Sequence, residues 1–210
     1  GTHGMMQVDY EQRIDFDRMR EYRVGRIKKY MEEFEIECLL LFESGNKRYS
    51  TSTAVASPEV DNMGRYAIVP HNGYPHIFGF GSEVAAEKLY CPWIKDTTFP
   101  AHGTMHGALP MEWKCYENFL ADLDMVLENH GLDKSQVRIG IDIVEVQIVL
   151  ALINGGYTIA DGQGVMQHAR AIKNEDEIMC LKHGAAIVDA AFHKIAQTIQ
   201  PGMKENDLQA

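Results

Sequence analysis

Two histidines four residues apart are the feature of this sequence that most suggests chemistry. His102 and His106 lie in a segment, residues 91–110, that contains several glycines and prolines and has Trp93 near its start. On a helix this spacing would place both imidazoles on one face, as metal ligation requires, but the glycines and prolines disfavour a helix. No cysteine or acidic residue lies between residues 97 and 111 to complete a metal site. We therefore predict that Trp93, His102 and His106 line a substrate pocket; the alternative is that both histidines are surface or loop-packing residues.

A second polar group precedes a predicted strand at residues 66–69. It contains Asp61, Asn62 and Arg65. An arginine can hold a carboxylate through two parallel hydrogen bonds, so Arg65 is a candidate for binding an acidic group of a substrate. The competing interpretation is a structural ion pair between Arg65 and either Asp61 or Glu59. We predict that Asp61, Asn62 and Arg65 bind substrate.

Other polar residues have structural explanations. Asp142 and Glu145 could form a carboxylate pair for acid–base catalysis, but Asp142 stands just before a predicted helix, where aspartate commonly caps the first turn. The segment Asn46–Tyr49 could present polar groups at a strand end, where open α/β sheets bind ligands, or could simply form a turn. Gly162-Gln163-Gly164 lacks the third glycine of a dinucleotide-binding turn, and the sequence contains no phosphate-binding loop motif. From these patterns we assign no catalytic residue and no metal ligand.

Composition narrows the class of protein. The chain of 210 residues contains 20 Lys and Arg against 30 Asp and Glu, for a formal net charge of -10. This acidic balance disfavours a nucleic-acid partner, because such binding needs clustered basic side chains to replace phosphate counterions. No apolar run approaches the roughly 20 residues of a membrane span, and the N-terminus does not have the pattern of a signal peptide. We expect a cytoplasmic protein with no membrane partner, whose four cysteines stay reduced: Cys38, Cys91, Cys115 and Cys180.

A mixed α/β fold is predicted to position these residues. The apolar run at residues 38–42 is typical of a strand buried on both faces, and Asn72-Gly73 is typical of a hairpin turn. We expect residues 44–46 to break the chain after that strand and residues 91–110 to form a long loop. The predicted order is helix 15–36, strand 38–42, strand 66–69, strand 74–80, helix 82–90, helix 112–129, strand 137–144, helix 145–154 and strand 157–160.

The last part of the sequence predicts the beginning of a second domain. Residues 161–164 are the best linker candidate, and beyond them apolar residues recur every three or four positions over residues 174–200, which predicts a long helix. Another helix is predicted to begin near residue 203. Since little chain follows to cover the apolar face of the long helix, we expect a complete domain and only the start of another. The predicted divisions are residues 1–14, a tag remnant and N-terminal extension, residues 15–165, the first domain, and residues 166–210, a linker and the first helix of a truncated second domain.

Three stretches of the sequence have the pattern of a known family. They are the strand at 38–42 followed by N-x-x-Y-x-T at Asn46–Thr51 and the strand Arg65–Pro70, then Arg138–Asp142, and finally Ala171–Ile178 with Ile199–Glu205. The first two stretches resemble the N-terminal domain of the creatinase/prolidase family. The third is the most specific, and it is similar to the junction and first helix of the "pita-bread" metallohydrolase domain of prolidase, aminopeptidase P and creatinase.

This resemblance implies a two-domain, homodimeric enzyme. In the family, a pair of divalent metal ions such as manganese is held by two Asp, one His and two Glu of the second domain, and none of those ligands maps onto this sequence. The N-terminal domain of one subunit often helps to close the active site of the other, which we expect here of residues 53–65 and 93–106. The expected function is the dimerising, site-completing domain of a metal-dependent Xaa-Pro peptidase that acts on small peptides and is catalytically incomplete in this chain alone.

Two further functions are compatible with the same residues. The stretch Asp17–Arg23, together with Asn62 and Arg65, is similar to the dimethylsulfoniopropionate lyase branch of the family, so the reaction could be cleavage of a C–S bond or another small-molecule reaction such as that of creatinase. One fold hosts many reactions, so a resemblance of fold does not choose between them. The third interpretation is a stand-alone binding or assembly module without catalysis.

Overall fold

The computed structural model describes three stretches of the chain, residues 14–53, 65–101 and 112–209. Two of the predicted substrate-binding residues, Arg65 and Trp93, lie within them. The other four lie outside the described residues, and their predicted role stays a prediction: Asp61, Asn62, His102 and His106.

The chain divides into two compact units. One is formed by Arg20–Ile172, and the other by the residues up to Met19 together with Lys173–Ala210. The domain division at residue 165 that the sequence suggests stays a prediction. Over the stretches that the structure describes, no helix combines the length and apolar character needed to cross a lipid bilayer.

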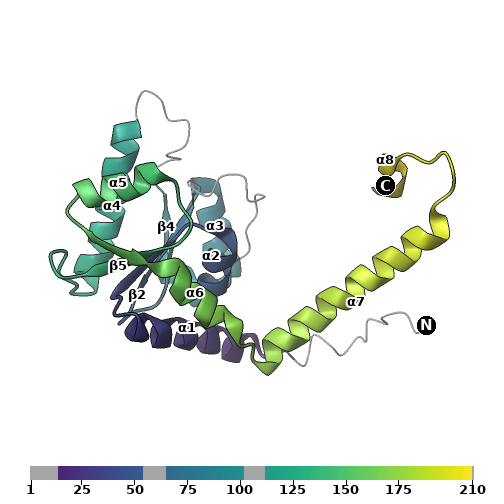
Figure 1. The fold of residues 1–210 in the computed structure, drawn as a ribbon, viewed down its shortest axis with the longest axis horizontal. Coiled ribbons are helices and arrows are strands. Elements are labelled where there is room, and N and C mark those ends of the chain that lie inside the picture. Colours follow the sequence, from purple (N-terminus) through teal and green to yellow (C-terminus); the bar gives the residue numbers. More distant parts are fainter. Residues whose placement is uncertain (1–13, 54–64, 102–111, 210) are drawn as a thin grey trace. The chain divides into compact units, whose positions relative to one another are not determined.

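A mixed sheet forms the centre of the Arg20–Ile172 unit (Figure 1). Among the described residues its six strands are β1 (Cys38–Leu41), β2 (Tyr66–Pro70), β3 (His76–Gly79), β4 (Thr98–Pro100), β5 (Arg138–Ile141) and β6 (Thr158–Asp161), in the order β4-β3-β2-β1-β5-β6. β1 is antiparallel to β2 and parallel to β5. β3 is antiparallel to β2 and parallel to β4, and β6 is parallel to β5. The mixed α/β class predicted from the sequence is confirmed.

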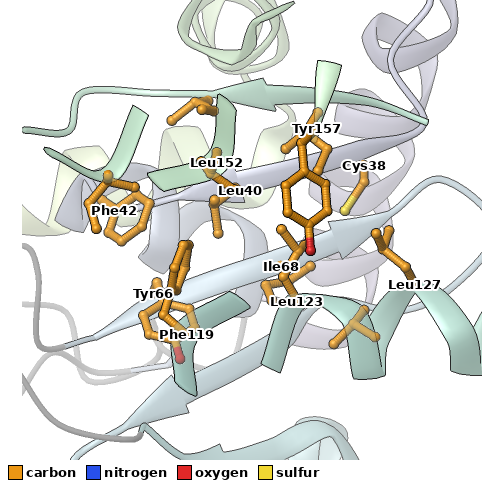
Figure 2. Close-up of a cluster of buried hydrophobic side chains, with 14 of the residues drawn as sticks. Cys38, Leu40, Phe42, Tyr66, Ile68, Phe119, Leu123, Leu127, Leu152 and Tyr157 are labelled. Atoms are coloured by element: carbon orange, nitrogen blue, oxygen red, sulfur yellow. The ribbon is translucent and has the colours of Figure 1, made fainter. Parts of the chain in front are cut away.

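Helices cover both faces of this sheet. One face is covered by α1 (Phe16–Glu33) and α6 (Gly162–Ala171), and the other by α4 (Glu112–Asn129) and α5 (Val146–Asn154). All four residues of β1 are buried, as expected of a strand covered on both sides. Leu39 and Leu41 pack in the cluster with α1 and α6, whereas Cys38 and Leu40 pack in the cluster with α4 and α5. Figure 2 shows Leu40 in that second cluster, to which α4 contributes Leu123.

The connections around β3 differ partly from prediction. The turn expected at residues 71–73 is confirmed, because β2 and β3 pair as antiparallel neighbours on either side of it. The prediction of a long loop over residues 91–110 is wrong for the part that the structure describes, residues 91–101. Residues 92–100 instead form a 3-10 helix, η2 (Pro92–Thr97), followed by β4, because β4 finds a parallel partner in β3.

A short helix, α2 (Ser44–Thr51), lies where the sequence predicts a break. Glu43 caps this helix by accepting the backbone N–H of Gly45 at 2.8 Å and that of Asn46 at 2.7 Å. The Ser-Gly-Asn start has low intrinsic helix propensity, so the expected break followed local preference. Capping and burial of most of the helix outweigh that preference here. The helix ends at Ser52, whose backbone is left-handed with φ 54°.

Residues 161–164 are not the irregular linker that the sequence predicts. Asp161 ends β6 and caps α6 by accepting the N–H of Gly164 at 3.0 Å. Glycine on both sides of a polar residue is usual in linkers, which explains the expectation. Here Gly162 instead lets the first turn of α6 lie directly against the backbone of β5.

The contact of α6 with β5 gives a stability prediction. A Cβ atom at Gly162 would lie 2.6 Å from the carbonyl carbon of Gly140 and 2.7 Å from the nitrogen of Ile141, so the backbone would have to shift. We expect Gly162→Ala to lower the free energy of unfolding by about 2–3 kcal/mol, measured by urea denaturation. In the matched control Gly25→Ala, the new methyl group meets open space on α1 and should raise that free energy by about 0.5–1 kcal/mol. Equal effects of the two variants would contradict the close approach.

The second unit contains the helices α7 (Glu175–Thr198) and α8 (Glu205–Gln209), which confirms the helices predicted at 174–200 and from residue 203. The buried carboxylate of Asp176, near the start of α7, accepts hydrogen bonds from Nε and a terminal nitrogen of Arg18, both at 2.8 Å. The same carboxylate accepts the N–H of Asp15 at 2.9 Å. The Arg18 guanidinium holds the pKa of Asp176 below its usual range.

Candidate functional site

The C-terminal end of α2 connects the two candidate residues that the structure describes. The indole Nε1 of Trp93, in η2, donates to the carbonyl oxygen of Thr51 at 2.9 Å. A terminal nitrogen of Arg65 donates to the hydroxyl of Thr53 at 2.8 Å. The hydroxyls of Thr51 and Thr53 are 2.8 Å apart and hydrogen-bonded. The segment Thr51–Thr53 therefore joins Trp93 to Arg65 through consecutive hydrogen bonds, and we call these four residues and Ser52 the threonine bridge.

The backbone of the threonine bridge is held in an uncommon conformation. Ser52 has φ 54°, a region that residues with a Cβ atom rarely adopt. Its N–H donates to the carbonyl oxygen of Arg48 at 2.9 Å, which closes the last turn of α2. Such conformations persist where the surrounding structure enforces them, and they concentrate at functional positions. The buried hydroxyls of Thr51 and Thr53 provide that enforcement on either side of Ser52.

Arg65 lies inside the protein rather than at its surface. It is 4% exposed and forms an ion pair with Glu87, 7% exposed, on α3 (Gly81–Tyr90). Burial raises the pKa of Glu87 above its usual range, an effect that Arg65 opposes and Glu83 reinforces. Among the described residues, one carboxylate oxygen of Glu83 and one of Glu87 are buried without a hydrogen-bond partner. A Cβ atom at Gly79 would lie 3.6 Å from each of these oxygens, so both lie close above that glycine.

This environment bears on the predicted role of Arg65. The sequence offered two interpretations, a clamp for a substrate carboxylate and a structural ion pair with Asp61 or Glu59. In the structure the guanidinium contacts a carboxylate of the protein, that of Glu87. Binding of substrate by Arg65 stays a prediction, and the observed geometry suits an arginine that holds Thr53 in place.

Trp93 is also held by more than one contact. Its ring lies under the guanidinium of Arg20 from α1, whose central carbon is 4.0 Å from the ring centroid. Such stacking is favourable for arginine over tryptophan. With the hydrogen bond to Thr51, this contact fixes both the plane and the direction of the indole.

Sequence reasoning missed several members of this site. Lys47, 3% exposed, donates from its ammonium group to the carbonyl oxygen of Arg65 at 2.9 Å and so ties α2 to the start of β2. Thr51 was within the quoted N-x-x-Y-x-T pattern, which is the signal that could have identified it. Thr53 begins the segment 53–65 that the resemblance singled out, although its contact with Arg65 spans 12 residues of sequence. Glu87 carries no such signal, because it meets Arg65 across 22 residues.

A second polar network lies at the carboxyl ends of β1 and β5. The carboxylate of Asp142 accepts the N–H of Phe42 at 2.8 Å, the N–H of Glu43 at 3.0 Å and the side-chain amide of Asn46 at 3.0 Å. Burial raises the pKa of Asp142, while those hydrogen bonds act in the opposite direction. Each oxygen of this carboxylate is thus occupied by donors of the protein.

The expectation that Asp142 caps the following helix is wrong. The N-cap of α5 is Glu145, without a side-chain capping bond. Asp142 points instead to the end of β1, because the free N–H groups there are nearer partners for a buried carboxylate. An acid–base pair of Asp142 and Glu145 also finds no support, since the first is buried and the second exposed.

The described residues do not form a metal centre. Over residues 14–53, 65–101 and 112–209, no group of three or more His, Cys, Asp or Glu side chains is placed to hold a metal ion. The metal pair implied by the sequence resemblance therefore does not fit these residues. None of the four cysteines, all within the described stretches, takes part in a disulfide.

Comparison with known proteins identifies the fold. The sequence is 25% identical over 191 residues to the dimethylsulfoniopropionate lyase DddP of Roseovarius nubinhibens, covering 89% of this chain and 42% of that protein. The structure matches a prolidase from Thermococcus sibiricus with a TM-score of 0.64 and 17% identity, over 90% of this chain and 47% of that one. It matches an Xaa-Pro dipeptidase from Bacillus anthracis with a TM-score of 0.61 and 17% identity, over 90% of this chain and 46% of that one. No family model matches the sequence.

These matches confirm the resemblance drawn from the sequence. The chain has the fold of the first part of prolidases and Xaa-Pro dipeptidases, with the mixed six-stranded sheet of their N-terminal domain. It spans about half the length of the solved structures and of the curated relative that it matches.

Proposed function

We propose that this chain supplies the N-terminal domain of a metal-dependent peptidase that cleaves bonds next to proline. The observation that carries the proposal is the match of about nine-tenths of the chain to a prolidase and an Xaa-Pro dipeptidase. In this proposal the domain forms the homodimer and completes the active site, and the chain alone is catalytically incomplete. The protein acts in the cytoplasm on small peptides.

The proposed contribution to the active site begins at the threonine bridge. The bridge fixes the chain just before residue 54, and the predicted substrate-binding residues Asp61 and Asn62 follow in sequence. Trp93, held by Thr51 and Arg20, offers a rigid apolar surface to a substrate side chain. Arg65 is the positioning residue, and His102 and His106 are the polar groups of the pocket.

Metal chemistry in this proposal belongs to residues outside the described ones. A divalent pair such as manganese would polarise the scissile carbonyl and activate water, as metal pairs do in hydrolases. The described residues would orient the peptide and exclude water from the site, and none of them is assigned as a ligand.

A second candidate is a lyase that acts on dimethylsulfoniopropionate. The sequence match to the lyase DddP favours it, because that match covers 89% of this chain at 25% identity. The two candidates share the fold, so they differ in pocket side chains rather than in architecture.

The experiment is a substrate comparison with the protein encoded by the whole reading frame that contains this sequence. Purified with Mn²⁺, it is expected to hydrolyse Xaa-Pro dipeptides, to lose that activity to a chelator and to regain it with added Mn²⁺. Dimethylsulfoniopropionate and creatine are the alternative substrates. The 210-residue chain, tested in parallel with Mn²⁺, is expected to show no turnover.

Each outcome decides between the candidates. Release of dimethyl sulfide without dipeptide hydrolysis would replace the peptidase by the lyase. Dipeptide hydrolysis by the 210-residue chain would overturn its catalytic incompleteness. Lack of turnover of all three substrates by the metal-loaded protein would favour a binding or assembly module and overturn both enzymatic candidates.

A further inference from the structure

Two carboxylate oxygens of α3 face the same small volume beside the sheet. Glu83 and Glu87 are four residues apart on that helix and therefore lie on one of its faces. One oxygen of each, Oε2, is buried, and among the described residues neither of these oxygens has a hydrogen-bond donor. The other oxygen of Glu87 pairs with Arg65. A buried oxygen without a donor is costly, and native proteins nearly always supply one.

Gly79, the last residue of β3, forms the floor of this volume. A Cβ atom there would lie 3.6 Å from Oε2 of Glu83 and 3.6 Å from Oε2 of Glu87, which are ordinary van der Waals distances. The φ angle of Gly79 is not positive, so the backbone conformation does not require glycine either. A glycine inside a strand often marks a place where a ligand approaches the backbone closely. The missing side chain therefore leaves room for a small molecule next to both oxygens.

The chemistry of the surrounding atoms indicates which molecule suits this volume. Two carboxylate oxygens repel an anion, and an apolar group has no hydrogen to donate to them. A cation would lie beside the guanidinium of Arg65, whose Nε is 3.7 Å from the position of the Cβ atom at Gly79, and like charges would repel. A water molecule is neutral and has two O–H donors, one for each Oε2 atom, while its lone pairs can face the guanidinium.

We propose that Glu83, Glu87 and Gly79 form a binding site for one internal water molecule, which donates a hydrogen bond to each of the two Oε2 atoms. Buried waters typically make about three hydrogen bonds to polar groups that would otherwise lack a partner. This water joins Glu83 to the ion pair of Glu87 with Arg65, and Arg65 in turn donates to Thr53 of the threonine bridge. The water is therefore part of what holds the bridge, whichever substrate the whole protein takes.

A crystal structure of the 210-residue chain tests the site directly. We expect one water molecule at about 2.6–3.2 Å from Oε2 of both Glu83 and Glu87. Direct contact between the two Oε2 atoms would indicate a shared proton instead, and a protein donor at the same place would replace the water. An anomalous peak at the site after exchange of sodium for rubidium would indicate a cation. Any of these results, or the lack of an ordered molecule there, would overturn the proposal.

Gly79→Ala tests what the water contributes to stability, because the new methyl group takes its place. If only packing and chain entropy mattered, this variant would be more stable than the wild type, since alanine restricts the unfolded chain more than glycine does. We expect the opposite result: the midpoint of urea denaturation should fall by about 0.5–1 M, because two buried oxygens lose their donor. A midpoint that is unchanged or higher would contradict the water site.

Two further variants separate the loss of the donor from the addition of a side chain. Gly79→Ser adds the same Cβ atom together with a hydroxyl that can donate to one of the oxygens, so its midpoint should fall less than half as far as that of Gly79→Ala. In Gly81→Ala, at the start of α3, the methyl group meets open space, and the midpoint should not fall. An equal fall in Gly79→Ser or in Gly81→Ala would overturn the proposal. None of these measurements uses a substrate, so their failure is distinguishable from failure of the proposed peptidase.

Discussion

Arg65→Ala should lower the free energy of unfolding by about 3–5 kcal/mol, the usual cost of removing one partner from a buried ion pair. The substitution leaves the carboxylate of Glu87 inside the protein without its cation, and that residue is 7% exposed. It also removes the donor to the hydroxyl of Thr53. Urea denaturation measures the change. A variant as stable as the wild type would show that the ion pair is not closed off from water.

The control for Arg65→Ala replaces both partners. In the double variant Arg65→Met/Glu87→Leu neither member of the ion pair is left without the other, and exchange of a buried pair for apolar residues of similar volume is often near neutral. We expect it to recover most of the lost free energy. Because burial raises the pKa of Glu87, the folded state holds that proton more tightly than the unfolded chain does. The contribution of Glu87 to stability is therefore full below its unfolded pKa and is lost as pH rises through the folded value, a dependence that the double variant should lack.

The same double variant separates stability from activity. If the whole protein carrying it is stable and loses kcat/KM against the active substrate, Arg65 positions or contacts the substrate. If kcat/KM is unchanged, Arg65 has no role in substrate binding or catalysis. The hydrogen bond between Thr51 and Trp93 is then sufficient to hold this part of the threonine bridge.

The central strands were predictable because their sequence is apolar without interruption. Burial of all four residues of β1 follows from the run at residues 38–42, and the Asn72-Gly73 turn correctly indicated the hairpin of β2 and β3. The same local reasoning failed for α2, whose first residues have low helix propensity. That helix depends on the side chain of Glu43 and on burial, which involve residues outside the window that a propensity describes.

The candidate site was predictable only in part, for a related reason. Residue type identified Arg65 and Trp93 as capable of binding, but contacts far apart in sequence determine what they bind. Arg65 meets Glu87 across 22 residues, and Trp93 meets Thr51 across 42. A resemblance to a family supplies the fold in which such contacts form, yet it leaves the substrate open, because the chain is similar in structure to peptidases and in sequence to a lyase.

The polar network at the ends of β1 and β5 shows how a long-range contact takes the place of a local one. Asp142 was expected to cap its own helix, three residues away. It instead accepts the N–H groups of Phe42 and Glu43, about 100 residues earlier in the chain. A strand end leaves unpaired N–H groups, and inside a protein these are costly unless they find an acceptor. The carboxylate of Asp142, which follows β5, therefore joins the end of β5 to the end of β1. It also positions Asn46 at the start of α2.

Asp142→Ala should accordingly lower the free energy of unfolding by about 3–5 kcal/mol, because two buried donors and the partly buried N–H of Glu43 lose their acceptor. Asp142→Asn keeps one acceptor oxygen in place, and since burial already disfavours the charged carboxylate, we expect it to cost only about 1–2 kcal/mol.

Amide hydrogen exchange at Phe42 and Glu43 measures the loss of these two hydrogen bonds locally, which a measurement of global unfolding does not. Both amides should exchange faster in Asp142→Ala, while that of Leu40, inside the paired strand, should change only as far as global stability does. Unchanged exchange at Phe42 would mean that another group accepts its N–H, and the role given to Asp142 in joining β1 to β5 would then be wrong.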